Sequence, residues 1–193
     1  MKENWNGDRD PLAALADGNP DLFESFVRTE LGTLLGFFRR LGGSPSEVED
    51  LVQDTIVKLF RSANQYTSSD RFDAYVFRAA RNVWIDSRRR AGVRGVSATT
   101  DSGEDTADLL ASVEGPEREP FERMETEERA ELLASAVERL DDAHRIVFEL
   151  GVIQGLPYAE VSLIVGVPVG TVKSRVHNAL GKLRDLLSPG GVA

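Results

Sequence analysis

The chain has 193 residues, 41% of them hydrophobic, and a formal net charge of −9. That length suits two small domains, and the absence of cysteine excludes disulfides and thiolate metal sites. With only His144 and His177 as imidazole ligands, and with neither a bilayer-length apolar run nor a secretory signal, we expect a cytoplasmic protein without cofactors or membrane insertion.

Three helices are predicted in the first half of the chain, after an N-terminal tail and helix lead-in over residues 1–19. The first begins at Asn19-Pro20 and ends at Gly42-Gly43, and the second begins with the capping-box pair Ser44 and Glu47. The third follows a polar loop (residues 62–70) and extends from about residue 71 to residue 90. Helical spacing predicts that these helices bury Leu22, Phe23, Phe26, Val27, Leu31, Leu34, Leu35 and Phe38, then Val48, Leu51, Val52, Thr55, Ile56, Leu59 and Phe60, then Phe72, Val76, Ala79 and Val83.

Residues 95–123 are rich in Ser, Thr, Gly, Pro and acidic side chains and contain few apolar ones. Burial in this stretch cannot offset the entropy of ordering the chain, about 1–2 kcal/mol per residue. We therefore expect an acidic linker between a domain over residues 20–94 and a second domain over residues 124–188, with a short tail over residues 189–193.

The second domain is also predicted to be helical, so the expected fold class is all-α: two small helical domains joined by a flexible acidic linker. A short helix over about residues 158–165 is followed by a glycine-containing turn and a longer helix, which is a helix-turn-helix. The apolar positions expected to face inward are Leu132, Leu133, Ala136, Val137, Leu140, Ile146, Val147, Leu150 and Ile153, then Val172, Val176, Leu180 and Leu183.

The last helix is a candidate DNA-reading helix. Such a helix lies in the major groove and presents hydroxyl, amide and cationic side chains to phosphates and base edges. Although the chain is acidic, residues 168–187 hold four basic residues and one aspartate, which favours local attraction to phosphate. The alternative is an ordinary helical hairpin with a solvated polar face. The outward candidates are Thr171, Lys173, Ser174, Arg175, His177 and Asn178.

Residues 137–187 resemble the C-terminal domain of bacterial sigma factors of the extracytoplasmic-function (ECF) type, most specifically in the run 166–177 (GVPVGTVKSRVH). The resemblance extends over residues 21–187. It implies a non-enzymatic subunit that directs RNA polymerase to promoters, with the six outward residues on the upstream, minus-thirty-five element. Pro157, Asn178 and Gly181 depart from the family's usual residues, which bears on affinity and promoter sequence and not on the class.

Residues 47–55 (EVEDLVQDT) resemble the family helix that docks on the coiled coil of the polymerase's largest subunit. Helical geometry gives this segment a polar face opposite its buried stripe, which is available to a partner. An ordinary solvated face is the alternative. The resemblance implies polymerase contacts through Asp50, Gln53, Asp54, Val57 and Arg61.

Residues 72–90 resemble the helix that binds the downstream, minus-ten element, and residues 62–70 lie where the family captures a flipped base. Residues 71–94 contain seven arginines and two aspartates, and this excess of positive charge suits the binding of single-stranded DNA. A helix dipole would explain the arginines at 88–90 but not those at 78 and 81, and Trp84 suits either the core or a stacking platform. The implied DNA contacts are Asn64, Tyr66, Arg78, Arg81, Asn82, Arg88 and Arg89.

The implied partners are core RNA polymerase, promoter DNA and an anti-sigma factor that clamps the two domains, and the free protein is expected to be a monomer. An anti-sigma factor is expected because no regulatory domain follows Leu187. The linker either occupies the polymerase's RNA channel or is a solvated tether, and both alternatives stay open.

Three other functions compete with this interpretation. A free-standing helix-turn-helix regulator leaves residues 47–55 and 72–90 unexplained, and it would keep specific DNA binding after deletion of residues 1–95, whereas a sigma factor would not. An enzyme is disfavoured because the sequence has no phosphate-binding glycine loop, metal cluster or nucleophile set. A degenerate sigma-like protein would bind polymerase without opening promoters, which the departures at Asn178 and Gly181 allow.

Overall fold

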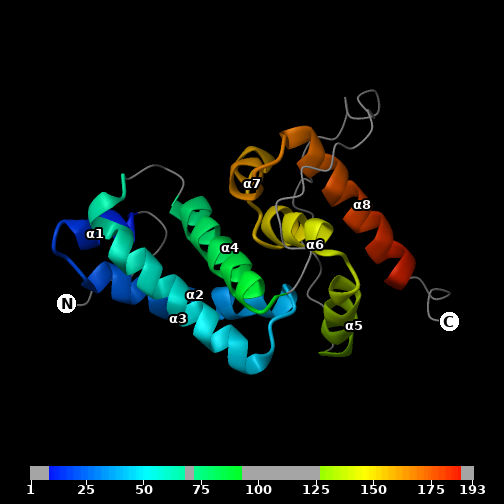
Figure 1. Ribbon diagram of the computed structural model, residues 1–193, viewed down its shortest axis with the longest axis horizontal. Helices are drawn as coiled ribbons and strands as arrows, with labels where there is room; N and C mark the ends of the chain where they lie inside the picture. The colour runs from blue at the N-terminus through cyan, green and yellow to red at the C-terminus, as the bar shows by residue number, and fades with distance from the viewer. Residues whose placement is uncertain (1–8, 68–71, 93–126, 188–193) are drawn as a thin grey trace. The chain divides into compact units, whose positions relative to one another are not determined.

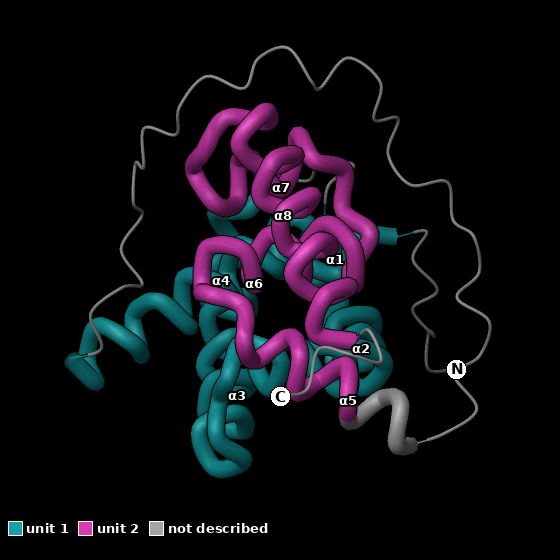
Figure 2. The backbone as a smooth tube through the Cα atoms, turned by 90° about the vertical axis from the view of Figure 1, so that its right-hand side faces the viewer, with its two compact units in different colours: residues 1–97 teal, residues 98–193 magenta. Residues whose placement is uncertain are grey.

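The computed structural model describes residues 9–67, 72–92 and 127–187, and these ranges contain helices and turns but no strand (Figure 1). The chain divides into two compact units, residues 1–97 and 98–193 (Figure 2). The whole of the predicted linker (residues 95–123) and of the predicted C-terminal tail (residues 189–193) lies outside the described residues. Among the described helices, none combines the length and the hydropathy needed to span a bilayer.

The first unit is a small helical bundle. Helix α3 (Pro45–Ser62) packs against both α2 (Asp21–Arg40) and α4 (Phe72–Arg90), and a 3₁₀ turn, η1 (Ala63–Gln65), extends it. The short helix α1 (Pro11–Ala16) packs on α2 and η1 (Figure 1). This last helix lies in residues that we predicted to be a tail and helix lead-in. Its six residues are too few for an apolar period, although Asp10 and Pro11 form an N-cap and first-turn pair.

The predicted helix boundaries of this unit follow from its caps. The Asn19 side chain accepts a hydrogen bond from the amide of Asp21 at 3.2 Å, so α2 begins within one residue of the predicted start. Gly42, with a φ of 93°, ends α2. Ser44 and Glu47 form the predicted capping box: the Glu47 carboxylate accepts from the Ser44 amide at 3.0 Å and from its hydroxyl at 2.7 Å.

Aromatic rings fill the core of the first unit. Phe37 and Phe38 are fully buried, and Phe37 lies 5.3 Å from Phe77 between ring centroids. Trp84 is only 6% exposed and packs 6.5 Å from Phe38, so it is a core residue and not an open stacking platform. These contacts join α2 to α4, whose inward face is therefore wider than the predicted stripe.

Two apolar positions predicted as buried in this unit are exposed: Leu31 at 42% and Phe60 at 56%. Each lies about 100° round its helix from the centre of the buried face, since successive residues are separated by that angle. Phe60 follows the fully buried Leu59, and its ring lies 6.0 Å from that of Phe23 between centroids.

The second unit contains α5 (Glu127–Glu138), α6 (Asp142–Phe148), a π-helical segment η2 (Glu149–Ile153), α7 (Tyr158–Val165) and α8 (Val169–Leu187). Helix α8 packs against α5, α6 and α7. One cluster of its buried residues consists of Ala136, Val137, Leu140, Phe148, Ala179 and Leu183.

Three predicted core positions of the second unit are exposed instead: Leu132 at 57%, Ile153 at 40% and Leu180 at 41%. On α8 the small residue Ala179 occupies the inward position that we gave to Leu180. The adjacent residue is again rotated by about 100° and leaves the packed face.

Candidate functional site

The turn between α7 and α8 is held by local hydrogen bonds. Gly166 ends α7 in the left-handed region with a φ of 76°, where a glycine has no steric cost. The hydroxyl of Ser162 donates to the carbonyl of Val167 at 2.6 Å, and the amide of Val172 donates to Pro168 at 3.0 Å. These contacts fix the two helices in the predicted helix-turn-helix order.

The candidate DNA-reading residues lie on the first turns of α8, around a buried side formed by Val172 and Val176. His177 and Asn178 are exposed. The Ser174 hydroxyl donates to the carbonyl of Thr171 at 3.1 Å, a bond within the helix. Half-buried positions are occupied by Thr171, Lys173, Ser174 and Arg175.

Pro157 is the N-cap of α7, with a φ of −54° and a ψ of 138°, and it makes no side-chain capping bond. It directly precedes the helix, which we expected over about residues 158–165. Its carbonyl accepts from the amides of Glu160 and Val161 at 2.8 and 3.0 Å, so the first turn still closes without a capping hydroxyl.

A charged cluster that no sequence pattern predicted joins the start of α6 to the second half of α8. Asp141 caps α6 through the amide of His144, and its carboxylate also meets His144 Nδ1 at 2.6 Å and Lys182 Nζ at 2.9 Å. Burial opposes ionisation of Asp141, but the bonds from His144 and Lys182 outweigh it and hold its pKa well below the usual range. The ammonium group of Lys182 is therefore paired with a carboxylate of its own unit, whereas a purely solvated lysine would have only water around it.

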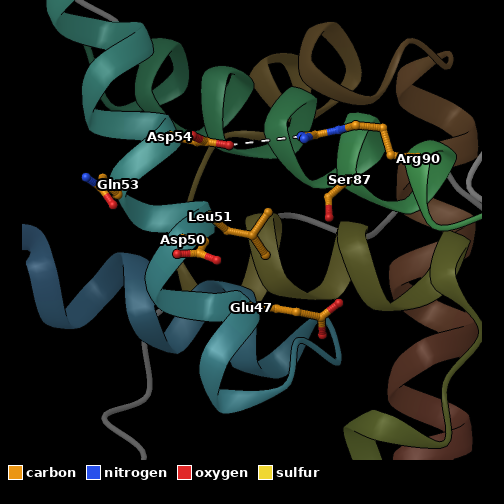
Figure 3. Close-up of a pocket in the computed structure, with 7 residues that line it drawn as sticks. All are labelled: Glu47, Asp50, Leu51, Gln53, Asp54, Ser87 and Arg90. Carbon is orange, nitrogen blue, oxygen red and sulfur yellow. Dashed lines mark ion pairs between the residues drawn. The ribbon is translucent and has the colours of Figure 1, made fainter.

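The outward face of α3 carries the residues predicted to dock on a partner. All five are exposed and lie on the side of α3 opposite its buried residues: Asp50, Gln53, Asp54, Val57 and Arg61. A hollow between α3 and α4 adjoins this face (Figure 3). Asp54 faces Arg90 of α4 across it, with 4.0 Å between the carboxylate and the guanidinium. Such an exposed pair contributes little to stability.

The arginines of α4 fall into two groups. Arg78 and Arg89 are exposed, and Arg81 is half-buried, with its pKa lowered by burial and by the nearby charge of Arg89. Arg88 is occupied inside the bundle: it donates to the carbonyl of Gly42 at 2.9 Å and stacks over Trp84. The predicted DNA contact at Arg88 would therefore compete with these internal bonds, whereas the exposed arginines are available.

The polar segment after η1 makes a contact that joins distant parts of the chain. Asn64 is exposed, and Asn82 on α4 is half-buried. The hydroxyl of Tyr66 donates to Asp10 Oδ2 at 2.7 Å, and its ring packs edge-on against Tyr75 of α4 with 4.7 Å between centroids. Residues 68–70 of the predicted base-capture loop lie outside the described residues. Asp10 was not predicted, because nothing in its local sequence indicates a partner 56 residues away.

Comparison with known proteins agrees with this division. A model of Sigma-70 region 2 matches residues 26–94, and a model of Sigma-70, region 4 matches residues 130–183. The ECF RNA polymerase sigma factor SigL of Mycobacterium tuberculosis is 31% identical over 182 residues, which cover 94% of this chain and 97% of SigL. The chain belongs to the ECF family of RNA polymerase sigma factors.

Two solved structures have the same fold as this ECF sigma factor. CnrH, in complex with the cytosolic domain of CnrY, aligns with a TM-score of 0.67 at 25% identity and covers 96% of this chain and 99% of its own. RpoE of Bartonella quintana, in complex with the anti-sigma factor NepR, aligns with a TM-score of 0.65 at 24% identity, covering 87% of this chain and 98% of its own.

The region matches assign the candidate residues of this ECF sigma factor to two groups. The exposed face of α3 and the exposed arginines of α4 lie within the region 2 match, together with Tyr66. The outward residues of α8 lie within the region 4 match. Asp10 and the whole of α1 precede the region 2 match.

Proposed function

We propose that this ECF sigma factor binds core RNA polymerase, recognises specific promoters and assists their opening as an alternative sigma factor. The observation that carries the proposal is the chain's division into a region 2 unit and a region 4 unit, each with polar side chains that are not used in its own core. Sigma factors are transcription initiation factors, and we propose that this one acts without catalysis of its own and in the cytoplasm, where polymerase and promoters are found.

The polymerase-binding surface is assigned to the exposed face of α3. Its support is a run of exposed side chains on one face: Asp50, Gln53, Asp54, Val57 and Arg61. Two carboxylates and an arginine beside an apolar Val57, 38% exposed, suit a mixed surface such as a coiled coil presents. In this proposal the contact is the coiled coil of the largest subunit.

The downstream promoter element is assigned to α4 and the segment after η1. Arg78 and Arg89 are exposed cations, and Tyr66 and Tyr75 supply half-buried rings on which an unstacked base can pack. Arg81, Asn82 and Asn64 complete the surface. Arg88 contributes mainly by holding the helix in place, because its guanidinium is bonded to Gly42.

The upstream element is assigned to α8. The helix-turn-helix turn presents the first turns of α8, and the backbone at Gly170 has open space around it, which permits close approach to a groove. Lys173 and Arg175 supply phosphate contacts, and the remaining outward side chains (Thr171, Ser174, His177 and Asn178) supply base-edge and phosphate hydrogen bonds.

An anti-sigma factor is proposed as the regulatory partner. One solved structure of the same fold contains such a partner: RpoE of Bartonella quintana is in complex with the anti-sigma factor NepR. A partner that covers the α3 face or α8 would block the surfaces assigned above. The free protein is proposed to be a monomer.

The test is run-off transcription from a genomic promoter library, with core polymerase and this protein as the sole sigma factor. We expect specific start sites that disappear in an Asp50→Ala/Asp54→Ala variant and in a Lys173→Ala/Arg175→Ala variant. Core binding without transcripts would indicate a degenerate sigma-like protein instead. Failure to bind core polymerase would contradict the proposal altogether.

A further inference from the structure

One carboxylate in the N-terminal helix is bonded to the proposed downstream surface. Asp10 lies 16 residues before the start of the region 2 match at residue 26, so that match does not include it. Its Oδ1 accepts from the amides of Leu12 and Ala13, at 3.0 and 3.2 Å, and caps α1. Its Oδ2 accepts from the hydroxyl of Tyr66 at 2.7 Å. One side chain therefore caps a helix and holds a phenol.

The contact continues from Tyr66 into α4. The Tyr66 ring lies 4.7 Å from the Tyr75 ring between centroids, with an interplanar angle of 61°, an edge-on arrangement that aromatic pairs favour. The guanidinium of Arg78 lies 5.2 Å from the Tyr75 centroid, within the range of a cation–π contact. Asp10, Tyr66, Tyr75 and Arg78 thus form a continuous row, which ends in an exposed cation.

Helix α1 holds the Asp10 end of this row in place. Pro11, Leu12 and Ala14 are buried, with Leu12 fully so, and α1 packs on α2 and on η1, the turn that leads to Tyr66. A hydrogen bond to an ionised carboxylate is about twice as strong as one between neutral groups. The bond from Tyr66 to Asp10 therefore ties the Tyr66 ring to the packed helix α1, although Tyr66 itself lies in an irregular segment.

We propose that Asp10 is a positioning residue for promoter opening, which acts through the Tyr66 hydroxyl on the orientation of Tyr66, Tyr75 and Arg78. The inference rests on the proposed function and deepens it. During opening, the unstacked DNA strand binds to aromatic rings and cations of the protein. Each of these groups that must first be ordered lowers the affinity for the strand, so side chains that are already in position favour opening. Asp10 does not itself touch DNA in this proposal.

The test separates the two roles of Asp10, the cap of α1 and the bond to Tyr66. In Asp10→Ser the side chain still caps α1, since serine ranks with aspartate as an N-cap, but its single short hydroxyl does not reach the Tyr66 phenol. Tyr66→Phe removes only the hydroxyl. Open complexes are measured by the fluorescence of 2-aminopurine placed in the downstream element, with holoenzyme at saturating core polymerase. Each variant is expected to lower the open-complex equilibrium on the order of tenfold.

The double variant Asp10→Ser/Tyr66→Phe decides whether the two residues act together. We expect the open-complex equilibrium of the double variant to be no lower than that of either single variant, because both substitutions remove the same bond. Asp17→Ser, at the exposed opposite end of α1, is the matched control and should open promoters like the wild type. For Asp10→Ser, the affinity for core polymerase and the thermal midpoint should stay near wild-type values while opening is reduced. If Asp10 had a merely structural role, loss of opening would be accompanied by a lower thermal midpoint or weaker binding to core polymerase.

Wild-type opening in Asp10→Ser, or additive losses in the double variant, would overturn the inference. If Asp10→Ser proves unstable, Tyr66→Phe tests the same bond with the cap intact, and unchanged opening in that variant also overturns it. These outcomes differ from a failure of the proposed function, in which the wild-type protein itself would give no open complexes.

Discussion

The guanidinium of Arg88 lies 4.0 Å from the centroid of the Trp84 ring, so an arginine from the basic end of α4 is stacked on the aromatic core of the first unit. The same side chain donates to the carbonyl of Gly42 at 2.9 Å, in the turn between α2 and α3. Glu47, in the first turn of α3, lies 4.0 Å away. Arg88 therefore ties the proposed DNA-binding helix to the start of the proposed polymerase-binding helix.

The first prediction concerns the stability of this tie. Arg88→Ala should lower the free energy of unfolding by about 2 kcal/mol, because it removes a cation–π contact and a charged hydrogen bond. The measurement is urea unfolding followed by Trp84 fluorescence, in a Trp5→Phe background that leaves one tryptophan. The neighbouring Arg89→Ala, at an exposed position, should change the free energy by less than about 0.5 kcal/mol. Equal losses in the two variants would contradict a special role for Arg88.

The second prediction concerns the α3 face. Asp50→Ala/Asp54→Ala should weaken binding to core polymerase about tenfold, since each exposed ion pair contributes up to about 1 kcal/mol. Glu49→Ala is the control: it removes one carboxylate from the same helix, where the double variant removes two, but it lies about 100° away from the docking face. The affinity is measured by competition for labelled core enzyme at low and high salt. A loss in Glu49→Ala equal to that in the double variant would indicate general electrostatic attraction and no defined face.

Local signals account for what the sequence predicts well. The capping box of Ser44 and Glu47 and the turn at Gly166 are each determined by residues a few positions apart, and both are present in the structure. The outward placement of Asp50 and Asp54 follows from helical periodicity alone. These features are visible without any tertiary contact.

Contacts between distant residues account for what the sequence misses. The bonds from Tyr66 to Asp10 and from Arg88 to Gly42 connect residues 56 and 46 positions apart, and no periodicity or motif indicates either. The exposure of Phe60 and Leu180 has a different cause. A run of adjacent apolar residues does not specify which of them lies at the centre of the buried face, and only the neighbouring helices decide it.

The third prediction separates two lysines of α8. Lys173→Ala and Arg175→Ala should each reduce the slope of log affinity against log salt concentration by about 1, as expected for loss of one phosphate contact. Lys182→Ala should leave that slope unchanged, because Lys182 is paired with Asp141 at 2.9 Å. The measurement is binding of the holoenzyme to a promoter fragment over a potassium chloride series. A reduced slope in Lys182→Ala would contradict the distinction between phosphate-binding and internally paired lysines.

The fourth prediction concerns the pH dependence of the second unit. The pKa of Asp141 is lowered in the folded protein, because bonds from His144 and Lys182 outweigh the opposing effect of burial. A carboxyl group with a lowered folded pKa stabilises the protein above its unfolded pKa of about 3.9, and this stabilisation is lost as the pH falls through the folded value. Asp141→Asn removes the charge and keeps the cap, since asparagine ranks with aspartate at that position.

Asp141→Asn should therefore unfold with a free energy lower by up to about 1 kcal/mol at neutral pH, the usual range for a partly exposed ion pair. The deficit should shrink as the pH falls below about 4, because the Asp141 carboxyl of the unfolded chain begins to bind a proton there, whereas that of the folded protein keeps its charge to lower pH. Urea unfolding, followed by the amide NMR signals of α6 and α8 from pH 7 to pH 3, measures both quantities. Asp185→Asn, an exposed aspartate on α8, is the matched control and should show a smaller deficit. If the Asp141→Asn deficit were the same at every pH, the loss would have to come from altered packing at the start of α6 and not from the charge that joins it to α8.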